Sequence, residues 1–301
     1  MMITNVIFNF TIYYFFAYAW LHLSLFFELS KTTNNITANG PWAYQNTRSE
    51  IENSLKWIPT KILKFTLNDV LLHFIRFQKI FYGLICIIIF LAINSHHQIN
   101  SHHQINSTFS NATLVYLYGL IILQFLFIFL HYVVCIRFRG LYNGGSDMMM
   151  MVIGIGQLIN LCCLIHGHHF MWGYLFIAVN LVISYFKAGL VKARSIDWIS
   201  GQALVYFIEH TNSRSLLRSF VLLNTKNMSL FFWKCLSYSV IIIELSMPLA
   251  LISHSLFWFY ATWAFIFHLN NFLIFGLNRF FWTWVLAWPS FYYIFKVLHT
   301  Y

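Results

Sequence analysis

The chain has 301 residues, of which 59% are hydrophobic, 20% are aromatic and only 9% are charged, and its formal net charge is +10. A soluble globular domain carries roughly 25% charged residues, so this composition excludes a chain that folds mainly in water. The basic residues lie in a few segments between apolar runs. Anionic lipid headgroups are therefore the expected partner of this charge, and nucleic acid is not.

Apolar runs of helical length recur along the chain. In hydrocarbon every backbone N–H and C=O must be paired within the protein, so such runs must be helices or closed barrels. A spanning helix needs about 20 mostly apolar residues, whereas a barrel strand needs about 10 that alternate, and the alternation is absent. We therefore expect an all-α polytopic membrane protein, a single transmembrane domain over 1–301 with no soluble domain.

About eight transmembrane helices are predicted. The second candidate is short, so the count depends on whether it crosses. The first run has no Lys or Arg before it and no small-residue cleavage site, which indicates a retained span and not a signal peptide. The predicted spans are 3–27, 80–93, 114–136, 148–165, 171–191, 231–252, 256–277 and 281–298.

Two partly amphipathic stretches suit helices that lie at the membrane interface, 53–79 within a loop over 29–79, and 199–223. Lys and Arg in short loops favour the cytoplasmic side of a membrane. With the amino terminus outside, the basic segments between spans all fall on that side. Lys192, at the end of the fifth span, then lies near the cytoplasmic face.

Histidine and cysteine patterns are weak evidence for a metal site. A hexapeptide, HHQINS, occurs twice in tandem over 96–107, and His166-Gly167-His168-His169 follows in a later loop. Paired histidines can hold zinc or copper, but local duplication in a tolerant loop leaves the same pattern, and we expect no metal. The five cysteines lie in apolar stretches without CxxC spacing and are interpreted as small apolar residues.

Four places in the apolar runs carry ionisable side chains, which cost about 2.5 to 3.5 kcal/mol each at the centre of a membrane and therefore invite a functional hypothesis. Asp147 follows a turn and opens the fourth span, where capping of the helix alone would explain it. Lys192, which follows Lys187 in the fifth span, either extends to the headgroups or acts as a base, because desolvation disfavours the charged form of an amine. Glu244 and His268 either form a buried pair or proton path, or only connect helices.

Three stretches around these residues resemble the membrane module of the vitamin K-dependent γ-carboxylase family. The first reads YFKAGLVK over 185–192 and continues with Asp197-Trp198 and Gly201. The second reads FHLNN over 267–271, with FGL and LAWP further on, and the third reads NGGSD over 143–147. The third is similar to the NGGD turn of the bacterial branch, called the HTTM domain. The resemblance covers about 138–289.

The resemblance implies a helical membrane module that, in the carboxylase, oxygenates a reduced quinone and uses the resulting base to carboxylate glutamate. Lys192 matches the family's catalytic lysine, which deprotonates the hydroquinone, and His268 and Asp147 are the further catalytic candidates. Asn143, Trp198, Glu244 and Asn271 are the binding candidates. A reduced quinone is thus the cofactor that the resemblance suggests.

The chain departs from the carboxylase in two ways. It has no histidine over 143–147, and no stretch corresponds to the large lumenal domain, so peptide carboxylation is not expected. It is more similar to stand-alone bacterial HTTM proteins, such as the membrane protein of a sporulation-delaying toxin system, which is associated with maturation of a secreted peptide. The resemblance implies a bacterial inner-membrane enzyme or maturation factor with a small secreted peptide as partner.

Two other classes of function stay open. A small-molecule transporter or channel usually shows inverted repeats and broken helices, and the two halves of this chain show no self-similarity. A non-catalytic scaffold or immunity protein would not need Lys192. The cytoplasmic position predicted for Lys192 differs from the lumenal action of the carboxylase, so either this protein is oriented differently or one apolar run re-enters without crossing.

Overall fold

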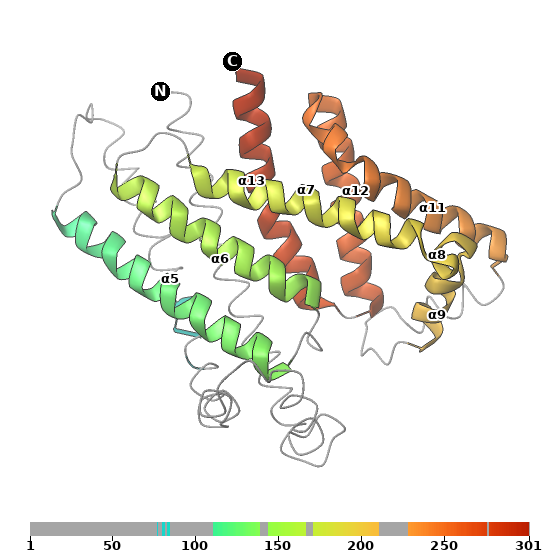
Figure 1. The fold of residues 1–301 in the computed structure, drawn as a ribbon, viewed down its shortest axis with the longest axis horizontal. Helices are drawn as coiled ribbons and strands as arrows, with labels where there is room; N and C mark the ends of the chain where they lie inside the picture. The colour runs from blue at the N-terminus through green and yellow to red at the C-terminus, as the bar shows by residue number, and fades with distance from the viewer. Residues whose placement is uncertain are drawn as a thin grey trace, which may run out of the picture. The chain divides into compact units, whose positions relative to one another are not determined.

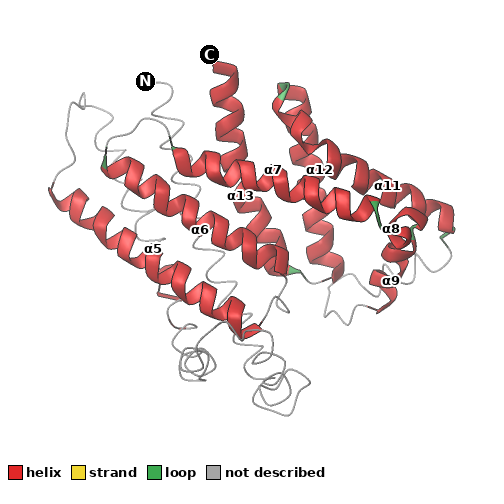
Figure 2. Ribbon diagram, in the orientation of Figure 1, coloured by secondary structure: helices red, strands yellow, loops and turns green. Residues whose placement is uncertain are grey.

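The computed structural model describes residues 77, 80, 81, 83, 84, 111–138, 144–166, 171–210, 228–275 and 277–300. These residues form helices and short connections, with no strand among them (Figure 2). The predicted span 3–27, the loop 29–79 apart from residue 77, and most of the span 80–93 lie outside the described residues. The part of the interfacial stretch 199–223 that follows residue 210 lies outside them too. The chain divides into two compact units, residues 1–173 and 174–301.

The first unit contains α5 (Asn111–Phe138) and α6 (Gly144–Ile165), which pack side by side (Figure 1). Two buried polar side chains of α5 connect the helices. Gln124 Nε2 donates to the carbonyl of Gly154 at 2.8 Å, and His131 Nε2 donates to the carbonyl of Asp147 at 3.2 Å. Hydrogen bonds of this kind join helices in lipid, where hydrophobic burial gives little association energy.

The second unit is built mainly from longer helices that were predicted as spans. Its helices are α7 (Trp172–Ala193, from Tyr174 onward), α8 (Ile196–Ser200), α9 (Gln202–His210), α11 (Leu230–Ser246), the 3-10 helix η1 (Met247–Leu251), α12 (His254–Phe275) and α13 (Asn278–Thr300). The sixth predicted span, 231–252, is therefore an α-helix followed by a 3-10 turn. Pro248 lies at the start of that turn, where its missing N–H is tolerated.

Helical periodicity decides which side chains the second unit buries. In α11 the buried residues recur every three or four positions and lie on one face: Trp233, Ser237, Val240, Ile241 and Glu244. In α12 the same spacing buries Phe257, Tyr260, Ala264 and His268. The helix α12 packs against α13 and η1, and α8 packs against α11 and α9. The buried face of α11 therefore includes the carboxylate of Glu244, and that of α12 includes the imidazole of His268.

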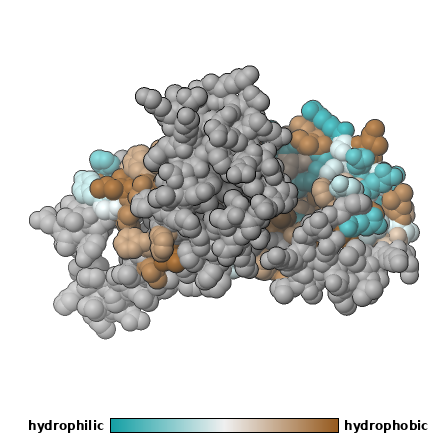
Figure 3. Space-filling model, turned by 90° about the horizontal axis from the view of Figure 1, so that it is seen from below, coloured by the Kyte–Doolittle hydropathy of each residue, from teal (hydrophilic) through white to brown (hydrophobic). Residues whose placement is uncertain are grey.

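Three of the described helices are long and apolar enough to cross a membrane, over 145–163, 172–193 and 230–251. The described part of α5, Tyr118–Tyr132, is apolar but shorter. The helices α12 and α13 have 22 and 23 residues, but their many Trp, Tyr and His side chains lower their hydropathy. Apolar side chains are also prominent on the described surface (Figure 3). An integral membrane protein is thus supported, whereas the predicted count of eight spans is not confirmed.

Candidate functional site

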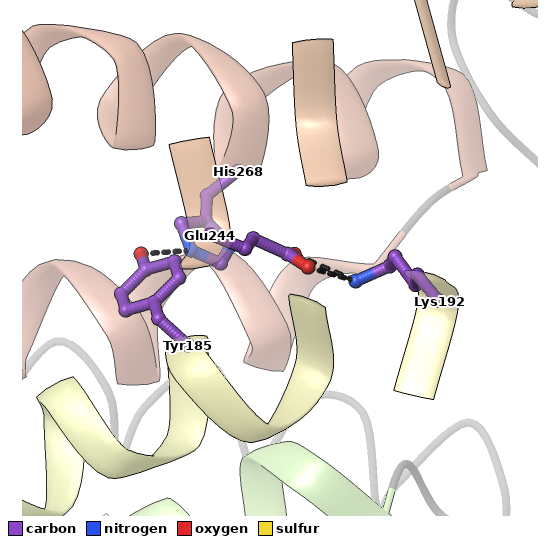
Figure 4. A network of polar contacts seen from close by, with 4 residues as sticks. All are labelled: Tyr185, Lys192, Glu244 and His268. Atoms are coloured by element: carbon purple, nitrogen blue, oxygen red, sulfur yellow. Dashed lines mark hydrogen bonds and ion pairs between the residues drawn. The ribbon is translucent and has the colours of Figure 1, made fainter. Parts of the chain in front are cut away.

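Lys192 and Glu244 form an ion pair within the second unit (Figure 4). Lys192 Nζ lies 2.6 Å from both carboxylate oxygens of Glu244 and donates to each. The Lys192 side chain is 17% exposed and that of Glu244 is 3% exposed. Lys192 closes α7, where extension toward the headgroups was the alternative prediction. In the structure its ammonium turns to a carboxylate of α11 instead.

Gly189 explains why α7 and α11 approach so closely beside this pair. A Cβ atom at Gly189 would lie 2.9 Å from the backbone nitrogen of Leu245 and 3.0 Å from Cβ of Glu244. Any larger residue would therefore push the α11 backbone away, one turn before Lys192. The glycine of the YFKAGLVK stretch thus positions Glu244 for its contact with the lysine.

Trp198 covers the same ammonium from α8. Lys192 Nζ lies 5.1 Å from the centroid of the Trp198 ring, within the range of a cation–π interaction. The Trp198 carbonyl accepts hydrogen bonds from Ser237 Oγ on α11 and from the backbone N–H of Gly201, the latter at 3.1 Å. These contacts hold the short helix α8 against α11.

Gly201 ends α8 in the left-handed conformation, with φ of 84°. A side chain is disfavoured there for two reasons, because L-residues rarely adopt this conformation and because a Cβ atom would lie 2.5 Å from the backbone nitrogen of Lys234. The glycine that follows the Asp197-Trp198 pair in the sequence therefore allows α8 to turn back against α11, with Trp198 beside Lys192.

A second polar pair, Tyr185 and His268, lies within an aromatic shell. The Tyr185 hydroxyl and His268 Nε2 are 2.7 Å apart and both residues are almost fully buried. The His268 ring stacks on Trp284 at 5.2 Å between centroids and lies 4.8 Å from Phe280, while Tyr185 meets Trp284 edge to face at 4.9 Å. These rings exclude water and make the hydrogen bond strong by lowering the local dielectric.

The two pairs belong to one site. Tyr185, Gly189 and Lys192 follow each other at spacings of four and three residues, which places them on one face of α7. Lys192 also acts electrostatically on His268, and Glu244 on Tyr185. The buried side-chain atoms without a hydrogen-bond partner among the described residues include His268 Nδ1 and Trp284 Nε1. The site therefore combines an amine, a carboxylate, a phenol and an imidazole with two donor or acceptor atoms that protein groups do not use.

The structure brings together Lys192, Trp198, Glu244 and His268, which were all proposed from the sequence. The predicted pairing of Glu244 with His268 differs from the structure, because Glu244 bonds to Lys192 and His268 bonds to Tyr185. Tyr185 was not among the candidates. The signal in the sequence was its position seven residues before Lys192, because two helical turns place both side chains on one face of the helix.

The remaining candidates lie elsewhere. Asp147 is buried in the first turn of α6 in the first unit, three residues after the helix begins at Gly144. His131 of α5 donates a hydrogen bond to the backbone carbonyl of Asp147. A histidine therefore contacts this turn, although residues 143–147 themselves include no histidine. Asn143 lies outside the described residues. Asn271 follows His268 by three residues on α12, and its backbone carbonyl accepts from the N–H of Leu277 at 3.3 Å.

Within the described ranges no group of His, Cys, Asp and Glu side chains is arranged to hold a metal ion. The repeat over 96–107 and the residues after His166 in the later histidine loop lie outside these ranges. Among the described cysteines, Cys135, Cys162, Cys163 and Cys235 form no disulfide.

The apolar helices and the polar site buried among them are those of a helical integral membrane protein. Residues 165–294 match the family model of the HTTM domain, and this segment includes both polar pairs and Trp198. The match indicates a membrane module of the carboxylase type. No curated protein and no solved structure matches the chain.

Proposed function

We propose that the second unit is the proton-transfer centre of a membrane-embedded HTTM-type enzyme or maturation factor, with Lys192 as the base. One observation carries this proposal. The lysine amine lies beside a buried carboxylate and an indole ring, next to a second polar pair. Structural connection of helices alone does not require four ionisable side chains in one place.

A membrane-soluble substrate with a weakly acidic hydroxyl suits this arrangement. A base in a site that excludes water takes such a proton without competition from solvent. The aromatic rings of Tyr185, Trp284 and Phe280 suit a flat ring, and the unpaired atoms His268 Nδ1 and Trp284 Nε1 suit its oxygen substituents. The residues thus fit a reduced quinone, which would supply the acidic hydroxyl and the redox chemistry.

The finer parts of the proposal come from the resemblance. They are a bacterial inner membrane as the location, a small secreted peptide as the partner, and supporting roles for Asp147, Asn143 and Asn271.

Oxidation of a reduced naphthoquinone by the purified full chain in lipid nanodiscs tests the proposal. We expect Lys192→Ala to lower the rate at least about 100-fold, since a positioned base contributes about 10²–10⁴-fold. Lys187→Ala is the matched control, because Lys187 lies on the same helix with an exposed side chain, and it should keep the wild-type rate. Equal rates for wild type and both variants would exclude Lys192 as the base and would favour a scaffold. In a separate assay, solute uptake by proteoliposomes would favour a transporter.

A further inference from the structure

The contact between Lys192 and Glu244 presents a chemical problem for the proposed function. An amine accepts a proton only through its lone pair, and the nitrogen of an ammonium has none. In an ion pair with Glu244, Lys192 Nζ already carries three protons. The base proposed above must therefore lose one of them before a substrate can deliver another.

Glu244 is the group placed to receive that proton. Both of its oxygens lie 2.6 Å from Lys192 Nζ, so a proton moves along an existing hydrogen bond. The Glu244 side chain is 3% exposed, and Lys192 supplies the only hydrogen bonds that its carboxylate accepts from the described residues. A buried ion pair is favourable only when further hydrogen bonds satisfy its remaining lone pairs, and this one lacks them.

We propose that Glu244 is the proton acceptor that makes Lys192 a base, an inference that rests on the proposed function. The N–H bond of the ammonium breaks and an O–H bond forms on Glu244. The products are a neutral amine and a neutral carboxylic acid, which need no solvation of charge. The resting site holds this neutral pair.

The groups that face the pair are consistent with this step. Tyr185 and Gly189 lie on the same helix as Lys192, His268 interacts with it from α12, and Trp198 faces it from α8. No second carboxylate and no second lysine or arginine contacts the pair in the described part of the chain. The charge state of the pair is thus set by the two groups themselves and by their burial.

The same step defines the chemical class of the substrate. A neutral hydroxyl acid, of the phenol or enol type, gives its proton to the amine and becomes an anion beside the new ammonium. Trp198 favours that ammonium through its ring face. Protonated Glu244 does not repel the anion, whereas an ionised Glu244 would. A substrate that arrives already ionised leaves the amine no proton to take.

Infrared spectroscopy of the full chain in lipid nanodiscs tests the neutral pair without any substrate. We expect wild type at neutral pH to show the C=O stretch of a protonated carboxylic acid, and the band to shift when glutamate carboxyls carry ¹³C. Glu244→Gln should remove this band. Glu209→Gln is the matched control, because Glu209 is exposed on α9, and it should leave the band unchanged.

Lys192→Met provides a second measurement. It keeps the length of the side chain but removes the amine, so Glu244 should stay protonated and the band should persist to higher pH than in wild type. A wild-type spectrum that shows only ionised carboxylate at neutral pH, with a band that appears only after Lys192→Met, would overturn the proposal and identify a permanent ion pair. Because the spectrum needs no turnover, this failure is distinct from a failure of the quinone oxidation assay.

Discussion

Tyr185 shows how one hydroxyl organises the buried half of the site. Its oxygen lies 2.7 Å from His268 Nε2, and its ring contacts Trp284. A tyrosine hydroxyl can donate to the unprotonated nitrogen of an imidazole, and in that arrangement His268 carries its proton on Nδ1, the atom without a protein partner. In that arrangement the phenol thus determines which nitrogen of His268 carries the proton.

Tyr185→Phe tests this role. The change removes the hydrogen bond but keeps the ring, so the free energy of unfolding should fall by about 1–3 kcal/mol, the cost of leaving a buried polar group unsatisfied. Thermal unfolding of the protein in detergent measures the effect. The control is Tyr238→Phe, because Tyr238 is exposed on α11. If both changes shift the midpoint equally, the bond to His268 does not contribute to stability.

At the scale of the helices, two glycines decide how closely α7 and α8 lie against α11. Gly189 allows the Glu244 backbone to approach α7, and Gly201 allows α8 to turn in the left-handed conformation. Both belong to the stretch that resembles the carboxylase family. Their function is therefore geometric, since they place a carboxylate and an indole ring around the amine of Lys192.

Gly189→Ala should separate α7 from α11. The added Cβ would lie 2.9 Å from a backbone nitrogen, which cannot rotate away as a side chain can. We expect a loss of about 1–3 kcal/mol in the free energy of unfolding, typical of overpacking, and a lower rate of quinone oxidation. Gly119→Ala in α5 is the matched control, because nothing lies within 4 Å of a Cβ there, and it should be neutral or slightly stabilising. Equal stability of the two variants would show that the approach at Gly189 is not required.

At the scale of the whole molecule, charge placement predicts the arrangement of the spans in the membrane. The rule for basic loops puts the loop around residue 139 and the end of α7 on the cytoplasmic side, and it puts residue 253, between η1 and α12, outside. Reporter fusions with alkaline phosphatase, which is active only outside the cytoplasm, measure this. We expect fusions after residues 139 and 195 to be inactive and a fusion after residue 253 to be active. An active fusion after residue 195 would mean that one earlier run does not cross, and it would place Lys192 on the outer side, as in the carboxylase.

The sequence by itself determined the helical membrane class, and it gave Lys192, Trp198, Glu244 and His268 as candidates but not Tyr185. Apolar runs of spanning length can pair their backbone groups only as helices here, and helical spacing places Gly189 and Lys192 on one face. Only the tertiary structure decided the partners, because Lys192 and Glu244 are 52 residues apart, and Tyr185 and His268 are 83 apart. No local periodicity encodes such contacts. They depend on how closely α7, α11 and α12 pack. At the contact between Lys192 and Glu244, Gly189 allows the close packing because it has no side chain.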